Sequence, residues 1–134
     1  MEKEIRVLVC EVGKNAYEKT IKNSLEEFQG LVNGLIEPFD LDNNLTIICN
    51  EEGKINGLPL NRSVKDEAEK IYEIIAGDFV VVGNSKDDFD SLSDEQLEIA
   101  MEKFKYPEEF YVGYGGLRAE KIINENSKKE DFIR

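Results

Sequence analysis

The sequence of 134 residues contains no histidine and no tryptophan, and it has only two cysteines and three prolines. Without histidine, the chain lacks the most common general base and the most common metal ligand of proteins. Cys10 and Cys49 both lie in apolar, strand-like stretches, where we expect buried, reduced thiols rather than a disulfide or a metal site. These absences argue against an enzyme, and we predict a protein with neither a cofactor nor a bound metal.

Long apolar runs are also missing. No stretch approaches the about 20 apolar residues of a membrane-spanning helix, and the charged first four residues are unlike a signal peptide. We therefore expect a cytoplasmic protein without a membrane partner. A chain of this length can form one domain with its own core.

Positive charge is scarce, since 17 Lys and Arg stand against 29 Asp and Glu, a net charge of −12. Residues 65–103 alone hold twelve acidic residues and four lysines, a net of −8. Such a field opposes direct binding to nucleic-acid phosphates. One interpretation is a solvated face, and the other is a nucleic-acid mimic that occupies a basic groove of another protein. The residues of that acidic surface would be Asp87, Asp88, Asp90, Asp94, Glu95 and Glu98.

The order of apolar stretches predicts an α+β fold. Helices are predicted between Ser24 and Gly34 and over residues 94–103. Residues 65–76 also show helical spacing, although residues 71–75 fit an extended conformation as well. We expect a single domain with a small mixed or mainly antiparallel sheet, packed by two or three helices. The predicted strands are residues 5–12, 16–22, 35–41, 45–49 and 78–83.

Local signals support these boundaries. Ser24 and Ser93 each precede a glutamate or glutamine three positions later, which is the spacing of a capping box. Gly34 fits the left-handed position that follows a helix. Pro38 restricts its strand to a sheet edge or a bulge, because proline has no N–H to donate.

The amino-acid composition of the chain changes after residue 105. Residues 106–116 are rich in aromatic residues and glycine, and residues 118–134 are charged with few apolar anchors. We therefore divide the chain into an α+β core domain, residues 1–105, and a C-terminal extension, residues 106–134. The extension is a candidate for binding a partner.

Residues 50–62 (NEEGKINGLPLNR) form the most informative motif. Gly53 can take the left-handed conformation of a strand-to-strand turn, and Gly57 and Pro59 interrupt the returning strand. The motif therefore predicts a rigid hairpin with its polar side chains held near one another.

This hairpin suits recognition better than catalysis. Arg62 is the best single candidate, because a guanidinium presents a planar fork to a carboxylate or a phosphate. Pairing with Glu51 across the hairpin is the equally weighted alternative. Exposed tyrosines of the extension can stack on a ligand as a lid. The candidate ligand-binding residues are Asn50, Glu51, Asn61, Arg62, Tyr111 and Tyr114.

Three groups of residues resemble a known family: residues 11–14 with 25–32, residues 50–62, and residues 74–77 with 82–83. Over residues 5–96 the chain is similar to a small domain-of-unknown-function family encoded by bacterial phages, plasmids and conjugative elements. The resemblance implies no established activity.

This setting leads to two expected functions of different classes. The first is a non-enzymatic binding protein of a mobile element, an accessory or anti-defence factor that binds a small, nucleotide-like ligand. Its pocket would be shared between subunits if the protein is a homo-oligomer. The alternative is an acidic inhibitor that blocks a basic host protein. Both would act in the cytoplasm of the bacterial host.

Overall fold

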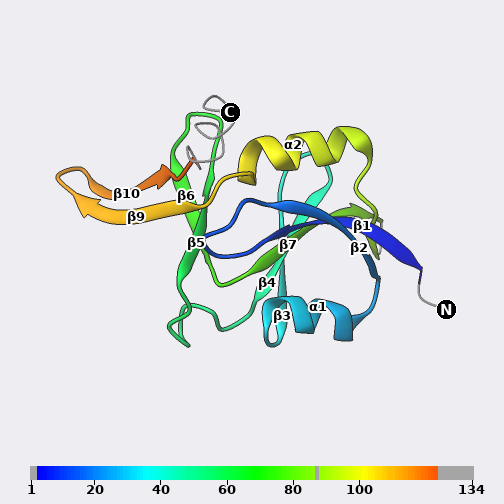
Figure 1. Cartoon of the computed structure of the whole chain (residues 1–134). Coiled ribbons are helices and arrows are strands. Elements are labelled where there is room, and N and C mark those ends of the chain that lie inside the picture. The colour runs from blue at the N-terminus through cyan, green and yellow to red at the C-terminus, as the bar shows by residue number, and fades with distance from the viewer. Residues whose placement is uncertain (1–2, 87, 124–134) are drawn as a thin grey trace, which may run out of the picture.

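The computed structural model describes residues 3–86 and 88–123, which form ten strands and two helices (Figure 1). The elements are β1 (Glu4–Cys10), β2 (Tyr17–Lys22), α1 (Leu25–Val32), β3 (Ile36–Asp40), β4 (Leu45–Asn50), β5 (Leu60–Lys65), β6 (Ile71–Ala76), β7 (Phe79–Ser85), β8 (Asp88–Asp90), α2 (Asp94–Phe104), β9 (Glu108–Gly113) and β10 (Gly116–Lys121). The predicted α+β class with a single domain is confirmed, and of the two or three helices predicted the described residues form two.

The main sheet has six strands, and every pairing in it is antiparallel. Its order is β2-β1-β7-β4-β3, and β8 pairs with the end of β7. The central position of β7 follows from its run of buried apolar residues, which requires cover on both faces. β3 lies at the edge of the sheet, as Pro38 predicts.

The two helices cover opposite faces of the main sheet (Figure 1). Side chains alternate along each strand, so the core has two halves. Val7 of β1 packs with Phe28 of α1, whereas its neighbour Leu8 packs in the cluster that contains Phe104 of α2. The rings of Phe104 and Phe79 meet edge to face, with centroids 5.5 Å apart.

Both helices begin where the capping signals predict. Ser93 forms a complete capping box at α2. At α1 the Ser24 hydroxyl accepts a hydrogen bond from the N–H of Glu27, at 3.2 Å. The left-handed residue that ends α1 is Asn33, with φ of 63°, and not the predicted Gly34. Asparagine tolerates this conformation better than most residues, which explains why the helix can end one residue earlier.

Among the described residues, β5 and β6 pair only with each other and form a separate two-stranded sheet. The helix predicted over residues 65–76 is therefore wrong, and the extended alternative for residues 71–75 is correct. Asp66 organises the turn between the two strands, because its carboxylate accepts the N–H groups of Ala68 and Lys70, both at 2.9 Å. The helical spacing of apolar residues within 65–76 arises by chance. The first part of this segment forms the turn, and the second part is β6, in which Ile75 is buried in the core.

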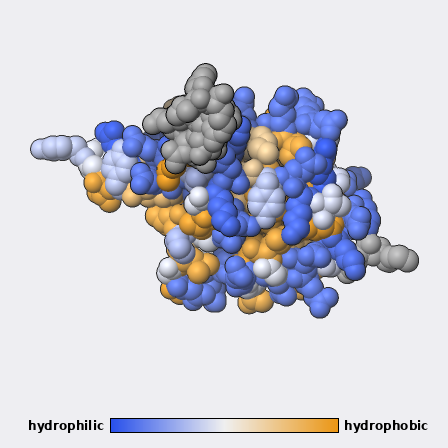
Figure 2. Space-filling model, viewed as in Figure 1, coloured by the Kyte–Doolittle hydropathy of each residue, from blue (hydrophilic) through white to orange (hydrophobic). Residues whose placement is uncertain are grey.

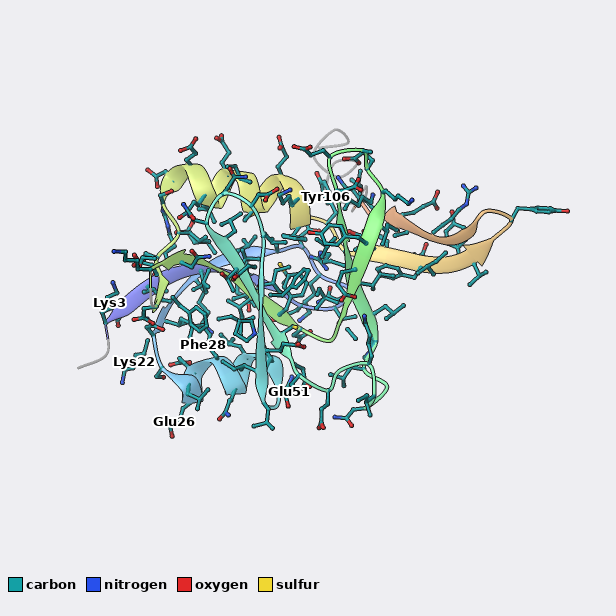
Figure 3. The ribbon with its side chains drawn as sticks, turned by 180° about the vertical axis from the view of Figure 1, so that it is seen from behind. Lys3, Lys22, Glu26, Phe28, Glu51 and Tyr106 are labelled. Carbon is teal, nitrogen blue, oxygen red and sulfur yellow. The ribbon has the colours of Figure 1, made fainter. Side chains whose placement is uncertain are left out.

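β9 and β10 form a second two-stranded sheet, which we call the arm. The arm projects from the body of the molecule (Figures 1 and 3). Glu108 at its base holds β5, because its Oε1 accepts the N–H and the hydroxyl of Ser63, at 3.0 and 2.7 Å. Residues 124–134 of the predicted extension lie outside the described residues. The division of the chain after residue 105 stays a prediction.

Candidate functional site

Residues 50–62 do not form a hairpin. β4 already has β3 and β7 on its two edges, so β5 cannot pair with it and joins β6 instead. The residues between β4 and β5 form a series of turns, in which Gly57 rather than Gly53 has a positive φ, of 73°. The motif is therefore a connection between two sheets, and the predicted hairpin is wrong.

Arg62 lies inside the protein and is 0% exposed. Its Nε donates to the carbonyl of Phe104 at 3.0 Å, and its Nη2 donates to the carbonyl of Lys14 at 2.8 Å. Its Nη1 donates to Oδ1 of Asn61 at 2.6 Å. The guanidinium thus joins β5 to the end of α2 and to the turn after β1, which leaves it inaccessible to a ligand and to Glu51.

Burial also acts on the charge of this residue. It lowers the pKa of the Arg62 guanidinium, and the neighbouring Cys10 and Glu108 partly oppose that effect. Arg62 remains cationic at neutral pH, because the ordinary pKa of arginine is far above 7. A buried cation that hydrogen-bonds backbone carbonyls serves the fold.

The two predicted asparagines also serve the fold. The side chain of Asn61 donates to the carbonyls of Cys10 and Gly77, at 2.9 and 2.8 Å. Asn50 donates to the two carbonyl groups at the C-terminal end of α1, at 3.1 and 3.2 Å, and accepts the N–H of Glu52. Both side chains are buried, so the polar residues of this motif satisfy backbone groups that the fold encloses.

Glu51 is exposed, but the predicted tyrosine lid does not lie over it. Tyr111 and Tyr114 belong to the arm and to its turn, and the arm leaves the body away from Glu51 (Figure 3). The six predicted ligand residues therefore do not form one site.

A groove of ≈ 260 Å³ opens beside the connection between β4 and β5, and we call it the acidic groove. It is lined by Glu51 and Asn50 from the predicted set and by side chains that the sequence did not single out. The carboxylates of Glu37 on β3 and Glu73 on β6 complete its charged wall. Lys54, Ile55 and Ile74 also line it.

One carboxylate of the groove is already paired. Lys54 Nζ lies 2.6 Å from Oε1 of Glu73. Burial acts to raise the pKa of Glu73, but hydrogen bonds from Lys54 and from the N–H of Ile74 lower the pKa below its ordinary value. Within residues 3–86 and 88–123, no ion pair involves Glu37 or Glu51. The groove therefore has a net negative charge.

The thiol at the groove is unreactive at neutral pH. Cys49 is buried, and its Sγ donates to the carbonyl of Glu37 at 3.5 Å. Burial, followed by the charges of Glu37 and Glu73, raises the pKa of this thiol to about 11. A protonated thiol is a poor nucleophile and a poor metal ligand. In the part of the chain that the structure describes, no group of three or more His, Cys, Asp or Glu residues could hold a metal ion.

The predicted acidic surface is divided between different roles. Asp90 pairs with Lys3 at 3.1 Å, and Asp94 pairs with Arg6 at 2.7 Å. Asp87 lies outside the described residues. The members of the set that are exposed and have no ion pair in the described ranges are Asp88, Glu95 and Glu98.

No helix in the described residues is long and apolar enough to cross a membrane. No curated protein and no solved structure matches the chain. A family model described as Domain of unknown function (DUF3846) matches residues 5–105, which include the main sheet, both helices and the β5–β6 sheet. The predicted resemblance to a domain-of-unknown-function family is confirmed at this level. The chain belongs to the DUF3846 family.

Proposed function

We propose that this protein is a non-enzymatic binding protein that receives a basic segment of a partner protein in the acidic groove. The observation that carries the proposal is the charge of the groove. Glu37, Glu51 and Glu73 contribute three carboxylates, and the single lysine, Lys54, is already bonded to Glu73. A cationic side chain of the partner could pair with Glu37 and Glu51, which form no ion pair within the described residues.

The apolar side chains of the groove favour the same occupant. Ile55 is 84% exposed, and Ile74 lines the groove next to the carboxylates. Arginine and lysine have an aliphatic stem with a charged head, so they bury the stem on apolar surface while the head reaches the carboxylate. Arginine has the further advantage that its planar fork can bind a carboxylate with two parallel hydrogen bonds.

A nucleotide-like ligand is less suited to this groove. Its phosphates would meet Glu37, Glu51 and Glu73, and Arg62, which was expected to receive them, lies in the core. A basic host protein, which the alternative hypothesis placed on the surface of residues 65–103, therefore suits this groove better than a nucleotide does. The net charge of −12 would accelerate the encounter with such a partner at low salt.

The biological setting rests on the resemblance to proteins of mobile elements. In that setting the partner is a basic host protein, and the chain is an accessory or anti-defence factor in the cytoplasm of a bacterial host. The fold itself carries no argument for this setting.

The test compares two variants with the same change in charge. Glu37→Gln/Glu51→Gln neutralises the groove, and Glu95→Gln/Glu98→Gln removes two negative charges from the exposed side of α2. An array of arginine- and lysine-rich peptides, followed by capture from bacterial lysate, identifies the partner, and titration gives the Kd. We expect the groove variant to weaken binding by about tenfold or more and the α2 variant to change it little.

The same pair of variants can refute the proposal. Loss of binding in Glu95→Gln/Glu98→Gln alone would move the interface to α2, as in the original acidic-surface hypothesis. Equal weakening in both variants would mean that total charge, rather than the groove, attracts the partner.

A further inference from the structure

The arm has an open edge along β10. In the described ranges β10 pairs only with β9, so its other edge has no neighbouring strand there. One hydrogen bond shows which backbone groups lie on that edge: the N–H of Ile122 donates to the carbonyl of Pro107, on the β9 side, at 2.7 Å. Backbone groups alternate in direction along a strand. The N–H and C=O groups of Leu117, Ala119 and Lys121 therefore point to the open edge.

Two other edge strands of the fold, β3 and β6, are blocked in ways that β10 is not. Pro38 leaves a gap in the row of N–H donors of β3. At β6, the carboxylate of Glu73 accepts the N–H of Ile74 at 2.8 Å and so occupies that donor. β10 contains no proline, and its side chains carry charges of both signs. Its edge is therefore suited to accept another strand.

The side chains of the arm are divided between its two faces. Residues that lie opposite each other in the register share a face, so Val112 with Leu117, and Phe110 with Ala119, form an apolar face. Val112 is 81% exposed and Leu117 is 46% exposed, and hydrophobic side chains are visible on the arm in Figure 2. A sheet of only two strands is marginally stable in water, so the arm would gain stability from further strands.

The opposite face of β10 carries its charges in a self-complementary order. Arg118 and Glu120 lie on this face, and neither forms an ion pair within the described ranges. When two copies of β10 pair antiparallel about a two-fold axis at Ala119, Arg118 of each copy lies opposite Glu120 of the other. Leu117 then lies opposite Lys121, whose aliphatic stem covers the leucine.

We propose that two copies of this chain pair through the open edges of β10, so that their arms form one four-stranded antiparallel sheet. The outward backbone groups of Leu117, Ala119 and Lys121 bond the two strands, and the two Arg118–Glu120 pairs fix the register. The same edge is used in both copies, so the assembly closes after two chains. The acidic groove takes no part in this contact, and failure of the dimer would leave the proposed function unaffected.

The contact is limited to the two arms, which makes the association reversible. Stable interfaces bury about 1,200–2,000 Å² in total, and the edges of two six-residue strands provide less. The net charge of −12 on each chain adds repulsion. The dimer therefore forms as the protein concentration rises, and it dissociates at the low concentrations used for unfolding titrations.

Sedimentation equilibrium of the full chain at increasing concentrations, in about 0.15 M NaCl, measures the dimer. Arg118→Glu places like charges opposite each other in both pairs, and Glu120→Arg does the same. Each variant alone should weaken the dimer by about tenfold or more. An equal mixture of the two variants should associate again, because the glutamates of one chain then face the arginines of the other.

The matched control for charge is Lys22→Glu on β2, which changes the net charge by the same amount as Arg118→Glu. Lys22 lies at the end of the molecule that is farther from the arm (Figure 3), so this variant should dimerise like the unchanged protein.

A further variant tests the backbone contact. Ala119→Pro removes an N–H that points to the open edge and none that joins β10 to β9, and proline is tolerated at such edge positions. The variant should keep the Tm of the unchanged protein at low concentration, and it should not dimerise.

Several results would overturn the proposal. These are a chain that stays monomeric at every concentration, a dimer that Arg118→Glu leaves intact, a mixture of the two charge variants that does not associate, or an equal loss in Lys22→Glu. Two results would give the edge to another occupant. A monomer whose Tm falls in Ala119→Pro would assign the edge to a segment of the same chain. Binding of a host protein to the monomer that Ala119→Pro abolishes would assign it to a foreign strand.

Discussion

Arg62 is the residue for which sequence and structure differ most. Because arginine is charged, the sequence predicted an exposed side chain, whereas the structure encloses it. Its carbonyl partners at Phe104 and Lys14 lie 42 and 48 positions away in the chain. A helix leaves its last carbonyl groups without partners, and a segment from elsewhere can supply the donor. No local pattern shows which donor that will be, so the sequence could identify Arg62 as important but could not give its role.

The role of Arg62 can be tested by Arg62→Met, which keeps most of the side-chain volume. Methionine leaves the enclosed carbonyls of Phe104 and Lys14 without donors, and unpaired buried polar groups destabilise the folded state. We expect the free energy of unfolding to fall by about 2–3 kcal/mol in urea titrations. Arg118→Met on the exposed arm is the control and should change it by less than about 0.5 kcal/mol. A stable Arg62→Met protein would show that the hydrogen bonds contribute little.

At the scale of elements, the sequence predicts what is local. The helix predicted over residues 94–103 is α2 (Asp94–Phe104), because capping box and apolar stripe both lie in the helix itself. Pairing of strands is not local. Residues 50–62 contain turn residues between two strands, which is also the pattern of a hairpin, and only the occupied edges of β4 exclude that pairing.

The connection between β4 and β5 packs closely against β6, and this leads to a prediction about Gly53. A Cβ at Gly53 would lie 2.7 Å from the backbone carbonyl oxygen of Ala76, whereas a Cβ at Gly30 in α1 would meet nothing within 4 Å. Gly53→Ala should therefore destabilise the protein by more than about 1 kcal/mol, since backbone must move. Gly30→Ala should stabilise it by about 0.5–1 kcal/mol, because alanine favours the helix. Thermal melting of both variants measures the difference, and an unchanged Tm in Gly53→Ala would show that the connection is loosely packed.

At the scale of the whole molecule, the net charge could be predicted from the sequence, but the grouping of charged side chains into sites could not. Composition alone gives the acidic character of the protein. The acidic groove, however, draws Glu37 from β3, Glu51 from the connection and Glu73 from β6. The site depends on how the β5–β6 sheet meets the main sheet, which is a tertiary property.

The two buried thiols make the stability of the whole molecule sensitive to alkaline pH. Burial, opposed by Arg62, raises the pKa of Cys10 from 9.0 to about 12, and burial, followed by the charges of Glu37 and Glu73, raises that of Cys49 from 9.0 to about 11. Between pH 9 and 11 the unfolded thiols lose their protons while the folded ones keep them. The unfolded state then binds fewer protons, so the free energy of unfolding falls as the pH rises.

Each thiol should lower the free energy of unfolding by about 1.4 kcal/mol per pH unit in this window. Urea titrations from pH 8 to 10.5, with a reducing agent present, measure this slope. Cys10→Ala/Cys49→Ala should start from a lower stability, because it leaves space in the core, but should show a much flatter decline. Repetition in 0.5 M NaCl screens the growing negative charge of the protein and separates general repulsion from the thiol effect. If both proteins decline in parallel, the loss of stability comes from repulsion among the carboxylates and other surface charges, and the thiols are not its cause.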